Sequence, residues 1–305
     1  MEQIYTLNKF YRERFGHKVY KLSLDAGMTC PNRDGTLDTR GCIFCSAGGS
    51  GDFASSRMLS ITEQIAEARQ RISRKIKQGR YIAYFQAYTN TYAHIDYLRK
   101  VYYEAISCDD IVGLSIATRP DCINDSILDL LSELNRIIPV FVELGLQTIH
   151  QSTAEFIRRG YNLDVFHNTV QNLSYIGINI VVHLILGLPD ETKDNMLDSV
   201  KYLNTLPVNG VKLQLLHILK NTDLAKLYNE GLFDTLSLEE YTCILAECIE
   251  LLRPDIVIHR MTGDGRKSDL ISPLWSGNKK MVLNYINKYF KEHNITQGRR
   301  YMCGS

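Results

Sequence analysis

Long hydrophobic runs are absent from this sequence, which argues against a protein that spans a membrane. The longest apolar stretch, residues 178–189, is interrupted by Asn179 and His183 and is too short to cross a bilayer. The first residues, Met-Glu-Gln-Ile-Tyr-Thr, also lack the apolar core of a secretory signal peptide. We therefore expect a cytoplasmic protein with no membrane partner.

The sequence also has little excess charge and little cysteine. Because 35 Lys and Arg residues nearly balance 34 Asp and Glu residues, the net charge of +1 gives no general reason to expect a polyanionic partner. Eight cysteines in 305 residues are too few for the disulfide framework of a small secreted protein. The apolar fraction of 45% is ample for a core, and one α/β barrel can use a chain of this length.

Three of the cysteines, Cys30, Cys42 and Cys45, lie close together in a loop rich in Gly, Asp and Thr. A structural zinc site normally needs four protein ligands, and no second Cys or His pair follows Cys45 at short range. An iron–sulfur cluster is held by thiolates, and three protein ligands leave one iron of a [4Fe–4S] cluster open to another molecule. On spacing alone, reduced thiols and a zinc site completed by a distant His stay open as alternatives.

Apolar segments alternate with amphipathic segments along the chain. We predict six strands, at residues 19–24, 81–87, 111–117, 140–146, 180–186 and 211–216. We predict helices near residues 93–107, 124–135, 150–158, 163–176, 192–204 and 237–252, and a further helix that opens with the capping-box pattern Ser60-Ile-Thr-Glu63. This alternation predicts an α/β fold, namely a partial (β/α)6 TIM-like barrel of parallel strands joined by right-handed crossovers.

The ends of the chain fit this barrel less directly. We expect residues 1–17 to form an N-terminal cap segment, residues 18–220 to form the barrel core, and residues 221–305 to form a small C-terminal extension that packs on the barrel. The extension contains a further strand at residues 256–260, followed by a glycine-containing turn that could close over the barrel mouth. Its single Trp, Trp275, is suited either to simple packing or to stacking on a base.

Polar side chains recur where the predicted strands end. The loops that follow parallel barrel strands meet at one mouth, and strand alternation indicates which side chains turn inward. The inward set is Gln86, Ser115, Arg119, Glu143, Gln147, His183, Lys212 and Gln214. Each alone could be a core polar group with satisfied hydrogen bonds. Together they predict a polar active site inside the barrel.

The cysteine loop resembles the signature of the radical S-adenosylmethionine (radical SAM) superfamily, in a form with eleven residues between the first two cysteines. Phe44 matches the aromatic residue that this superfamily places before its third cysteine. Four further segments resemble, in order, the motifs of the branch related to the elongator catalytic subunit, and in particular its YhcC-type bacterial members. These segments are Thr118-Arg-Pro-Asp121, Val142-Glu-Leu-Gly-Leu-Gln-Thr148, Arg159-Gly160 and Leu184-Ile-Leu-Gly-Leu-Pro189.

The resemblance implies two cofactors, a [4Fe–4S] cluster and S-adenosylmethionine (SAM). Cys30, Cys42 and Cys45 would ligate three irons, and SAM would occupy the fourth and be cleaved reductively to a 5′-deoxyadenosyl radical. Glu143 and Arg119 would make polar contacts to SAM, while Gly187 and Leu188 would border its adenine. The full predicted set of cofactor-binding residues is Phe44, Gln86, Arg119, Glu143, Gln147, His183, Gly187 and Leu188.

The sequence departs from the radical SAM pattern in two respects, and the resemblance also favours one substrate. Residues 86–91, Gln-Ala-Tyr-Thr-Asn-Thr, replace the Gly-Gly-Glu that most of these enzymes use to hold the methionine amino group. No acetyltransferase segment follows the barrel, so we expect no acetyl-CoA chemistry. The resemblance favours a tRNA substrate, with conversion of a wobble-uridine carboxymethylaminomethyl group to aminomethyl, and an electron donor of the flavodoxin or ferredoxin type.

Two features of the sequence are compatible with RNA but leave the substrate open. A basic helix face at residues 69–80 and the aromatic, basic N-terminal segment suit RNA, but both also suit ordinary structural roles. A small metabolite or a porphyrin-like molecule is the alternative substrate. An iron–sulfur or zinc binding module without turnover is the alternative from another class of function.

Overall fold

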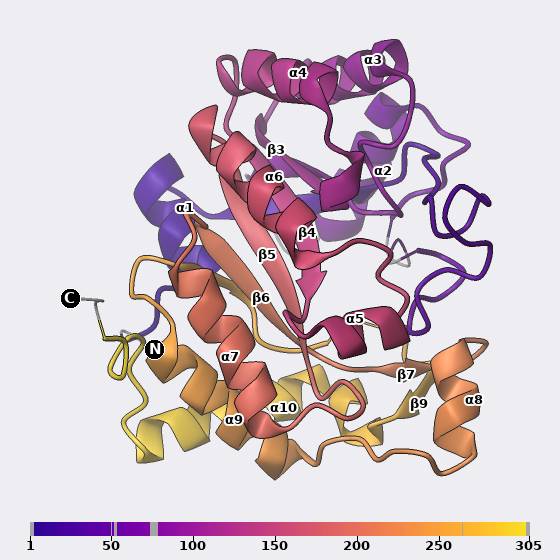
Figure 1. Cartoon of the computed structure of the whole chain (residues 1–305). Helices are drawn as coiled ribbons and strands as arrows, with labels where there is room; N and C mark the ends of the chain where they lie inside the picture. The colour runs from indigo at the N-terminus through magenta and orange to yellow at the C-terminus, as the bar shows by residue number, and fades with distance from the viewer. Residues whose placement is uncertain (1–2, 50, 52–53, 74–78, 264, 303–305) are drawn as a thin grey trace.

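The fold was examined in a computed structural model, which describes residues 3–49, 51, 54–73, 79–263 and 265–302. Within these residues the main sheet has seven strands in the order β1-β2-β3-β4-β5-β6-β8, and all neighbouring strands pair in parallel. The strands are β1 Val19–Leu24, β2 Arg80–Phe85, β3 Ile111–Thr118, β4 Val140–Gln147, β5 Asn179–Leu186, β6 Gly210–Leu215 and β8 Val257–Arg260. The sheet is curled, and helices cover its outer side (Figure 1).

Helices connect the successive strands. The helices of the described residues are α1 Leu7–Phe15, α2 Ile61–Ser73, α3 Ile95–Ile106, α4 Asp125–Asn135, α5 Gln151–Phe156, α6 Leu163–Tyr175, α7 Lys193–Asn204, α8 Asp223–Asn229, α9 Leu238–Leu251 and α10 Lys279–Glu292, with short 3-10 helices η1 Pro120–Cys122 and η2 Leu274–Gly277. The capping box predicted at the start of α2 is confirmed. The Glu63 N–H donates to the Ser60 hydroxyl at 3.2 Å, and the Ser60 N–H donates to the Glu63 carboxylate at 2.8 Å.

The partial barrel predicted from the alternation is confirmed, with one more strand than the six expected. The strand predicted at residues 256–260 pairs with β6 and so becomes the seventh member of the same sheet. Its sequence is too short and too far from the regular repeat for periodicity to place it there. The β2 strand also ends two residues earlier than predicted, at Phe85, and the chain then turns at Tyr88, which has a left-handed backbone conformation (φ 58°).

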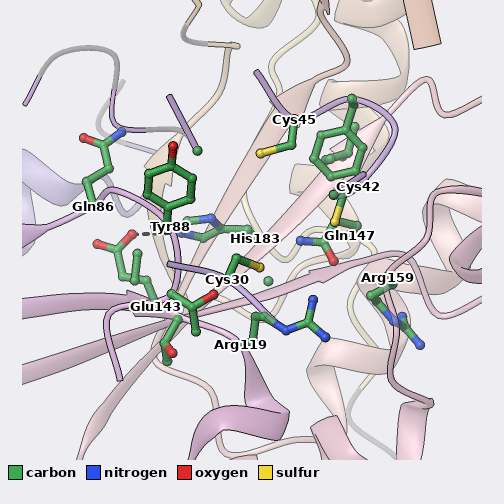
Figure 2. A pocket seen from close by; sticks show the side chains of 18 of the residues that line it. Cys30, Cys42, Cys45, Gln86, Tyr88, Arg119, Glu143, Gln147, Arg159 and His183 are labelled. Atoms are coloured by element: carbon green, nitrogen blue, oxygen red, sulfur yellow. Dashed lines mark hydrogen bonds and ion pairs between the residues drawn. The ribbon is translucent and has the colours of Figure 1, made fainter. Parts of the chain in front are cut away.

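Strand alternation divides the sheet into two faces. On β4, Val142, Leu144 and Leu146 are fully buried in the core between the sheet and the outer helices. Glu143, between them in sequence, is also buried, but it points into the barrel interior (Figure 2). The apolar face therefore stabilises the fold, and the interior face is left for polar side chains.

The N-terminal helix α1 packs against the sheet through its aromatic residues. The rings of Phe10 and Tyr11 lie 6.1 and 6.4 Å from the ring of Phe141, near the start of β4. Tyr11 is buried, whereas Arg12 is exposed. The aromatic part of this segment is therefore used in packing.

The C-terminal residues add helices α8, α9 and α10 and a two-stranded antiparallel sheet of β7 Ile218–Leu219 and β9 Leu270–Ser272. Trp275 lies against this region, where its indole N–H donates to the Leu236 carbonyl at 3.1 Å and its ring lies 6.0 Å from that of Tyr241. Among the helices of the described residues, none has the length and apolar character needed to span a lipid bilayer.

Candidate active site

A cavity at the carboxyl end of the strands joins the cysteine loop, residues 30–45, to the barrel interior. Its walls come from the loop and from β2, β3, β4, β5, β6 and β8. The polar and sulfur-containing side chains that line it are Cys30, Arg33, Cys42, Cys45, Tyr84, Gln86, Tyr88, Thr89, Thr118, Arg119, Glu143, Gln147, Arg159, Tyr161, His183, Lys212, Gln214 and Arg260. Convergence of this many polar groups is typical of a site that recognises and transforms a ligand.

The three cysteines of the loop all line this cavity. None is in a disulfide, and each is partly exposed. Figure 2 shows their sulfur atoms turned towards a common space. Burial raises the pKa of the Cys42 thiol to about 12, so this thiol ionises at neutral pH only when a strong positive charge, such as that of a bound metal, offsets the burial.

Backbone turns and two polar side chains fix the loop around these sulfur atoms. The Arg33 and Cys45 N–H groups donate to the carbonyls of Cys30 and Cys42 at 2.8 and 3.0 Å. The Arg33 guanidinium reaches across the loop and donates to the Cys45 carbonyl at 2.9 Å. The buried Asn32 amide donates to the Arg158 carbonyl at 2.7 Å and to the Cys42 sulfur at 3.4 Å. A loop without regular structure is therefore held in a defined conformation.

Glu143 lies at the centre of the barrel interior and is 1% exposed. Its Oε1 atom accepts hydrogen bonds from the ammonium of Lys21 and, at 2.7 Å, from the hydroxyl of Ser115. The same ammonium lies 3.4 Å from the Ser115 hydroxyl. These contacts connect β1, β3 and β4 through one carboxylate oxygen.

The other carboxylate oxygen of Glu143 connects β4 to the rest of the interior. Oε2 accepts hydrogen bonds from the Tyr84 hydroxyl at 3.0 Å, from His183 Nε2 at 2.8 Å, and from the Lys212 ammonium. Burial alone would raise the pKa of Glu143, but the charges of Lys21 and Lys212 and the His183 hydrogen bond outweigh it and hold this pKa well below its usual range. We name these six residues, Lys21, Tyr84, Ser115, Glu143, His183 and Lys212, the Glu143 network.

His183 is neutral in this network. Burial and the positive charge of Lys212 lower its pKa to about 4, against the opposing effect of Glu143. Because its Nε2 atom faces a carboxylate oxygen, that nitrogen carries the proton and donates it. His183 therefore acts as a neutral hydrogen-bond donor in this arrangement.

Of the six other residues predicted to bind the cofactors, four line the cavity and two do not. Gln86, Arg119, Gln147 and Phe44 line the cavity with the cysteines, and Arg119 is oriented by a bidentate pair with Asp121 at 2.9 and 2.7 Å. Gln147 follows a bulge in β4 and has a left-handed backbone conformation (φ 62°). An added Cβ at Gly145 would lie 2.4 Å from the Gln147 side-chain amide, so glycine at 145 leaves the room that this amide occupies.

Gly187 and Leu188 are placed differently from the other predicted cofactor contacts, since neither lines the cavity. The Gly187 N–H contacts the Met196 sulfur at 3.2 Å, and Leu188 is buried in a small apolar cluster with Ile43 and Ile185. Of this cluster, Ile185 does line the cavity. The role predicted for Gly187 and Leu188 stays a prediction.

The residues that sequence reasoning missed include Tyr84 and Tyr88, which line this cavity, and Lys21, which donates to Glu143 from β1. Lys21 lies on β1 with Ser23, at alternate positions between the buried residues Val19, Leu22 and Leu24. The alternation that predicted Glu143 to face inward would also have predicted Lys21. Tyr84 gave no such signal, because every residue of β2 after Arg80 is buried and most of them are apolar.

The side chains of the described residues suit an iron–sulfur cluster better than a single metal ion. Within the described part of the chain, no three His, Cys, Asp or Glu side chains are arranged to bind a single metal ion. A [4Fe–4S] cluster makes a different demand, because each thiolate binds a separate iron atom of a larger group. Three thiols that open onto one cavity, with an Asn32 N–H beside one sulfur, fit such a cluster in number and in chemistry.

The chain matches two protein-family models. The model described as "Radical SAM superfamily" matches residues 39–203, and the one described as "Radical_SAM C-terminal domain" matches residues 208–292. The first range is more than half of the chain and includes Cys42 and Cys45, whereas Cys30 precedes it. The first range ends in the last turn of α7, and the second begins in the loop that leads to β6.

Two bacterial relatives match over nearly their whole length. "Uncharacterized protein YtqA" of Bacillus subtilis is 44% identical over 298 residues, which are 98% of this chain and 92% of the relative. "Protein YhcC" of Escherichia coli is 39% identical over 283 residues, which are 92% of this chain and 90% of the relative. The YhcC-type resemblance is thus confirmed.

More distant matches connect the chain to the elongator branch. "tRNA uridine(34) acetyltransferase" of Methanocaldococcus jannaschii is 25% identical over 191 residues, which are 60% of this chain but 34% of that protein. The solved structure of the archaeal Methanocaldococcus infernus Elp3 superposes with a TM-score of 0.69 at 16% identity, over 92% of this chain and 64% of the Elp3 chain. At this identity the structural likeness concerns the fold.

Proposed function

The chain belongs to the radical SAM superfamily, and we propose that it is an enzyme that cleaves SAM reductively to modify the wobble uridine of tRNA. Membership implies a [4Fe–4S] cluster and SAM as cofactors. The observation that carries the proposal is the convergence of Cys30, Cys42 and Cys45 on one cavity that opens onto the polar barrel interior. Reductive cleavage of SAM requires thiolate ligands for the cluster and polar groups for SAM around one shared cavity.

When bound, the reduced cluster supplies the electron that splits SAM and yields a 5′-deoxyadenosyl radical able to abstract a hydrogen atom from an unreactive carbon. The protein's own part is to bind, orient and shield. Cys30, Cys42 and Cys45 would hold the cluster by one thiolate each. Asn32 would position Cys42 by its hydrogen bond to the sulfur, in the way that outer hydrogen bonds orient metal ligands.

SAM would occupy the cavity between the cysteine loop and the strand ends. We assign its polar contacts first to Arg119, Gln147 and Gln86, whose side chains line this space. Both oxygens of Glu143 already accept hydrogen bonds from protein groups, so we assign Glu143 chiefly to holding His183 and Lys212 in place. Phe44, Gly187 and Leu188 would border the apolar side of the nucleoside.

The tRNA substrate is supported by the relatives. One of them is named a tRNA uridine(34) acetyltransferase, and its match with this chain covers 60% of the present sequence. We propose conversion of a 5-carboxymethylaminomethyl group to 5-aminomethyl on uridine, with a flavodoxin- or ferredoxin-type protein as the electron donor. A hydrogen atom would pass from the carboxymethyl methylene to the 5′-deoxyadenosyl radical, and one electron would return to the oxidised cluster. Water would then hydrolyse the resulting imine, so that the two carbons leave as glyoxylate.

The basic helix face adds little to this proposal. Within the described residues, Arg71 pairs with Glu67 at 3.2 Å, and Arg80 pairs with Asp110 at 3.4 Å. Arg74, Lys75 and Lys77 lie outside the described residues. Charges that already have acidic neighbours attract phosphates less strongly, so the support for tRNA comes from the relatives.

The proposal is tested with anaerobically reconstituted protein. SAM and a low-potential reductant should yield 5′-deoxyadenosine, and addition of tRNA from a strain that lacks the gene should produce aminomethyluridine, measured by nucleoside mass spectrometry. Protein with zinc and no cluster, or a cluster that never cleaves SAM, would instead favour a binding module. Cleavage of SAM with no change in any tRNA nucleoside would favour a small-molecule substrate.

A further inference from the structure

A second cavity adjoins the candidate active site inside the barrel. Tyr84, Gln86, Lys212 and Arg260 line both cavities, so the second one continues from the first. Its other described lining residues are Leu7, Lys21, Ser23 and His259. Cationic side chains thus face this space from β1, β6 and β8, and among its described lining residues none is Asp or Glu.

Lys21 and Lys212 each keep one donor to spare. An ammonium group has three N–H bonds. The described hydrogen bonds account for two of them on Lys21, to Glu143 and Ser115, and for two on Lys212, to Glu143 and Tyr84. Lys212 is 4% exposed, so little water can satisfy its third donor.

The positive charges of Lys21 and Lys212 also outnumber by one the negative charge of the carboxylate beside them. Glu143 is the carboxylate that both lysines share, so the two ammonium charges exceed the one carboxylate charge between them. Lys21, Lys212 and Arg260 line the same cavity, and burial, together with the positive charges of Lys21 and Arg260, lowers the pKa of Lys212. Nδ1 of His259 is buried on the same wall and finds no hydrogen-bond partner among the described residues.

We propose that the cavity lined by Lys21, Lys212 and His259 is a substrate subsite that binds a carboxylate. One carboxylate oxygen would accept the remaining N–H of Lys212, and the other would accept that of Lys21 or the N–H of His259 in its Nδ1-protonated form. The added negative charge would balance the second ammonium group. The subsite would therefore select substrates that end in a carboxylate next to the carbon that reacts.

A carboxylate suits this space better than a phosphate. Lys21 and Lys212 already bind the carboxylate of Glu143, which shows that their spacing matches a planar two-oxygen group. The cavity also joins the active site at Tyr84 and Gln86, so a short substrate arm can reach it from the mouth. The inference rests on the proposed function, because the carboxymethylaminomethyl arm of the uridine would supply this carboxylate.

The test compares an acid with its neutral ester. The probes are the nucleoside 5-carboxymethylaminomethyluridine and its methyl ester, titrated calorimetrically into reconstituted holoprotein with SAM and no reductant. We expect the wild-type protein to bind the acid at least 10-fold tighter, because hydrogen bonds to charged groups are typically strong enough for a difference of this order. In Lys212→Met, the acid should lose this advantage while the affinity for the ester changes less than about 2-fold.

Two further variants keep the test independent of folding. His259→Gln leaves both lysines and Glu143 in place and should lower the preference for the acid by a smaller factor. The matched control is Lys18→Met, since Lys18 is exposed directly before β1 and its ammonium lies 4.9 Å from the Tyr20 ring. This control should keep the full preference for the acid.

Each outcome bears on the proposal separately from the tRNA function. Equal binding of acid and ester by the wild type would overturn the subsite, even if tRNA is modified. A preference that survives in both Lys212→Met and His259→Gln, or competition by inorganic phosphate as strong as that by the acid, would also overturn it. Loss of the preference in these variants would support the subsite, even if no tRNA nucleoside changes.

Discussion

The mouth and the interior of the barrel are built in different ways. At the mouth, the cysteine loop is held by turns, by the Asn32 amide and by the Arg33 guanidinium, and its thiols face the cavity. In the interior, the Glu143 network joins side chains from six of the strands, β1 to β6, through direct hydrogen bonds. The interior network joins strands by direct side-chain contacts and holds Lys21 and Lys212 beside the proposed subsite, whereas the loop at the mouth presents the thiols to the cavity.

Removal of one thiol at the mouth should have the largest effect on activity. In Cys42→Ala, a cluster with two thiolate ligands would be lost or displaced, so SAM cleavage should fall by at least about 10³-fold. The free energy of unfolding of the cluster-free protein should change little. The measurements are 5′-deoxyadenosine release and urea denaturation.

Cys243→Ala is the matched control, because Cys243 is another partly exposed thiol that does not line the cavity. It should keep normal cleavage. If Cys42→Ala cleaved SAM at the wild-type rate after anaerobic loading, the mouth would not be the chemical centre and the comparison would fail.

Neutralisation of Glu143 should have the largest effect on stability. Glu143→Gln leaves the buried Lys212 and the partly buried Lys21 with no carboxylate between them, and it turns an amide N–H towards other donors. Loss of one partner in a buried ion pair typically destabilises by about 3–5 kcal/mol. Urea denaturation of the cluster-free protein measures this.

Glu133→Gln is the control for this change. Glu133 pairs with Arg99 at 2.5 Å on the surface, where both side chains are more than 40% exposed. Its loss should change the free energy of unfolding by less than about 1 kcal/mol. Equal effects of the two substitutions would show that the Glu143 network does not stabilise the fold.

Loss of the Asn32 hydrogen bonds in the cysteine loop should make the protein lose iron more readily. Asn32→Ala removes the hydrogen bonds to Cys42 and to the Arg158 carbonyl, so cluster affinity should fall by about 10- to 100-fold, as for other substitutions beside metal ligands. Iron loss to a chelator measures this. Asn162→Ala removes an N-cap hydrogen bond at α6 and should cost about 1 kcal/mol of stability with unchanged iron retention. Faster iron loss in both variants would indicate a general loss of stability.

The sequence was informative about the strands and the thiols for a physical reason. Parallel strands buried on one face leave a clear period of two, so the inward position of Glu143 and the outward position of Leu144 could be predicted. The cysteines were evident because three thiols lie within sixteen residues in a pattern that resembles the radical SAM signature. The bounds of β1 were predicted to the residue.

Long-range partners could not be predicted in the same way. Lys21 and Lys212 are separated in the sequence, and nothing local indicates that both ammonium groups meet the carboxylate of Glu143. The pairing of β8 with β6 depends likewise on the fold of the intervening chain. Gly187 and Leu188 were predicted from a motif, which gives the order of residues and not the direction of their side chains, so their role near the nucleoside stays a prediction.

The smallest effect expected is the pH dependence that Lys212 gives to stability. Burial lowers the pKa of Lys212 to about 7, helped by Lys21 and Arg260 and opposed by Glu143, whereas in the unfolded chain this pKa is near its ordinary value of 10.5. Between these values the unfolded state binds more protons than the folded state, so stability should rise with pH. Below pH 7 both states are protonated, and the contribution of Lys212 should be constant there.

The comparison with Lys212→Met isolates this effect. The free energy of unfolding of the wild type relative to the variant should increase between pH 7 and 10 by about 1 kcal/mol per pH unit, with the maximum slope set by one proton. Urea denaturation at a series of pH values measures it. A difference that stays flat across this range would mean that Lys212 remains charged in the folded protein. Glu143 would then hold both lysines as ions beside the neutral His183.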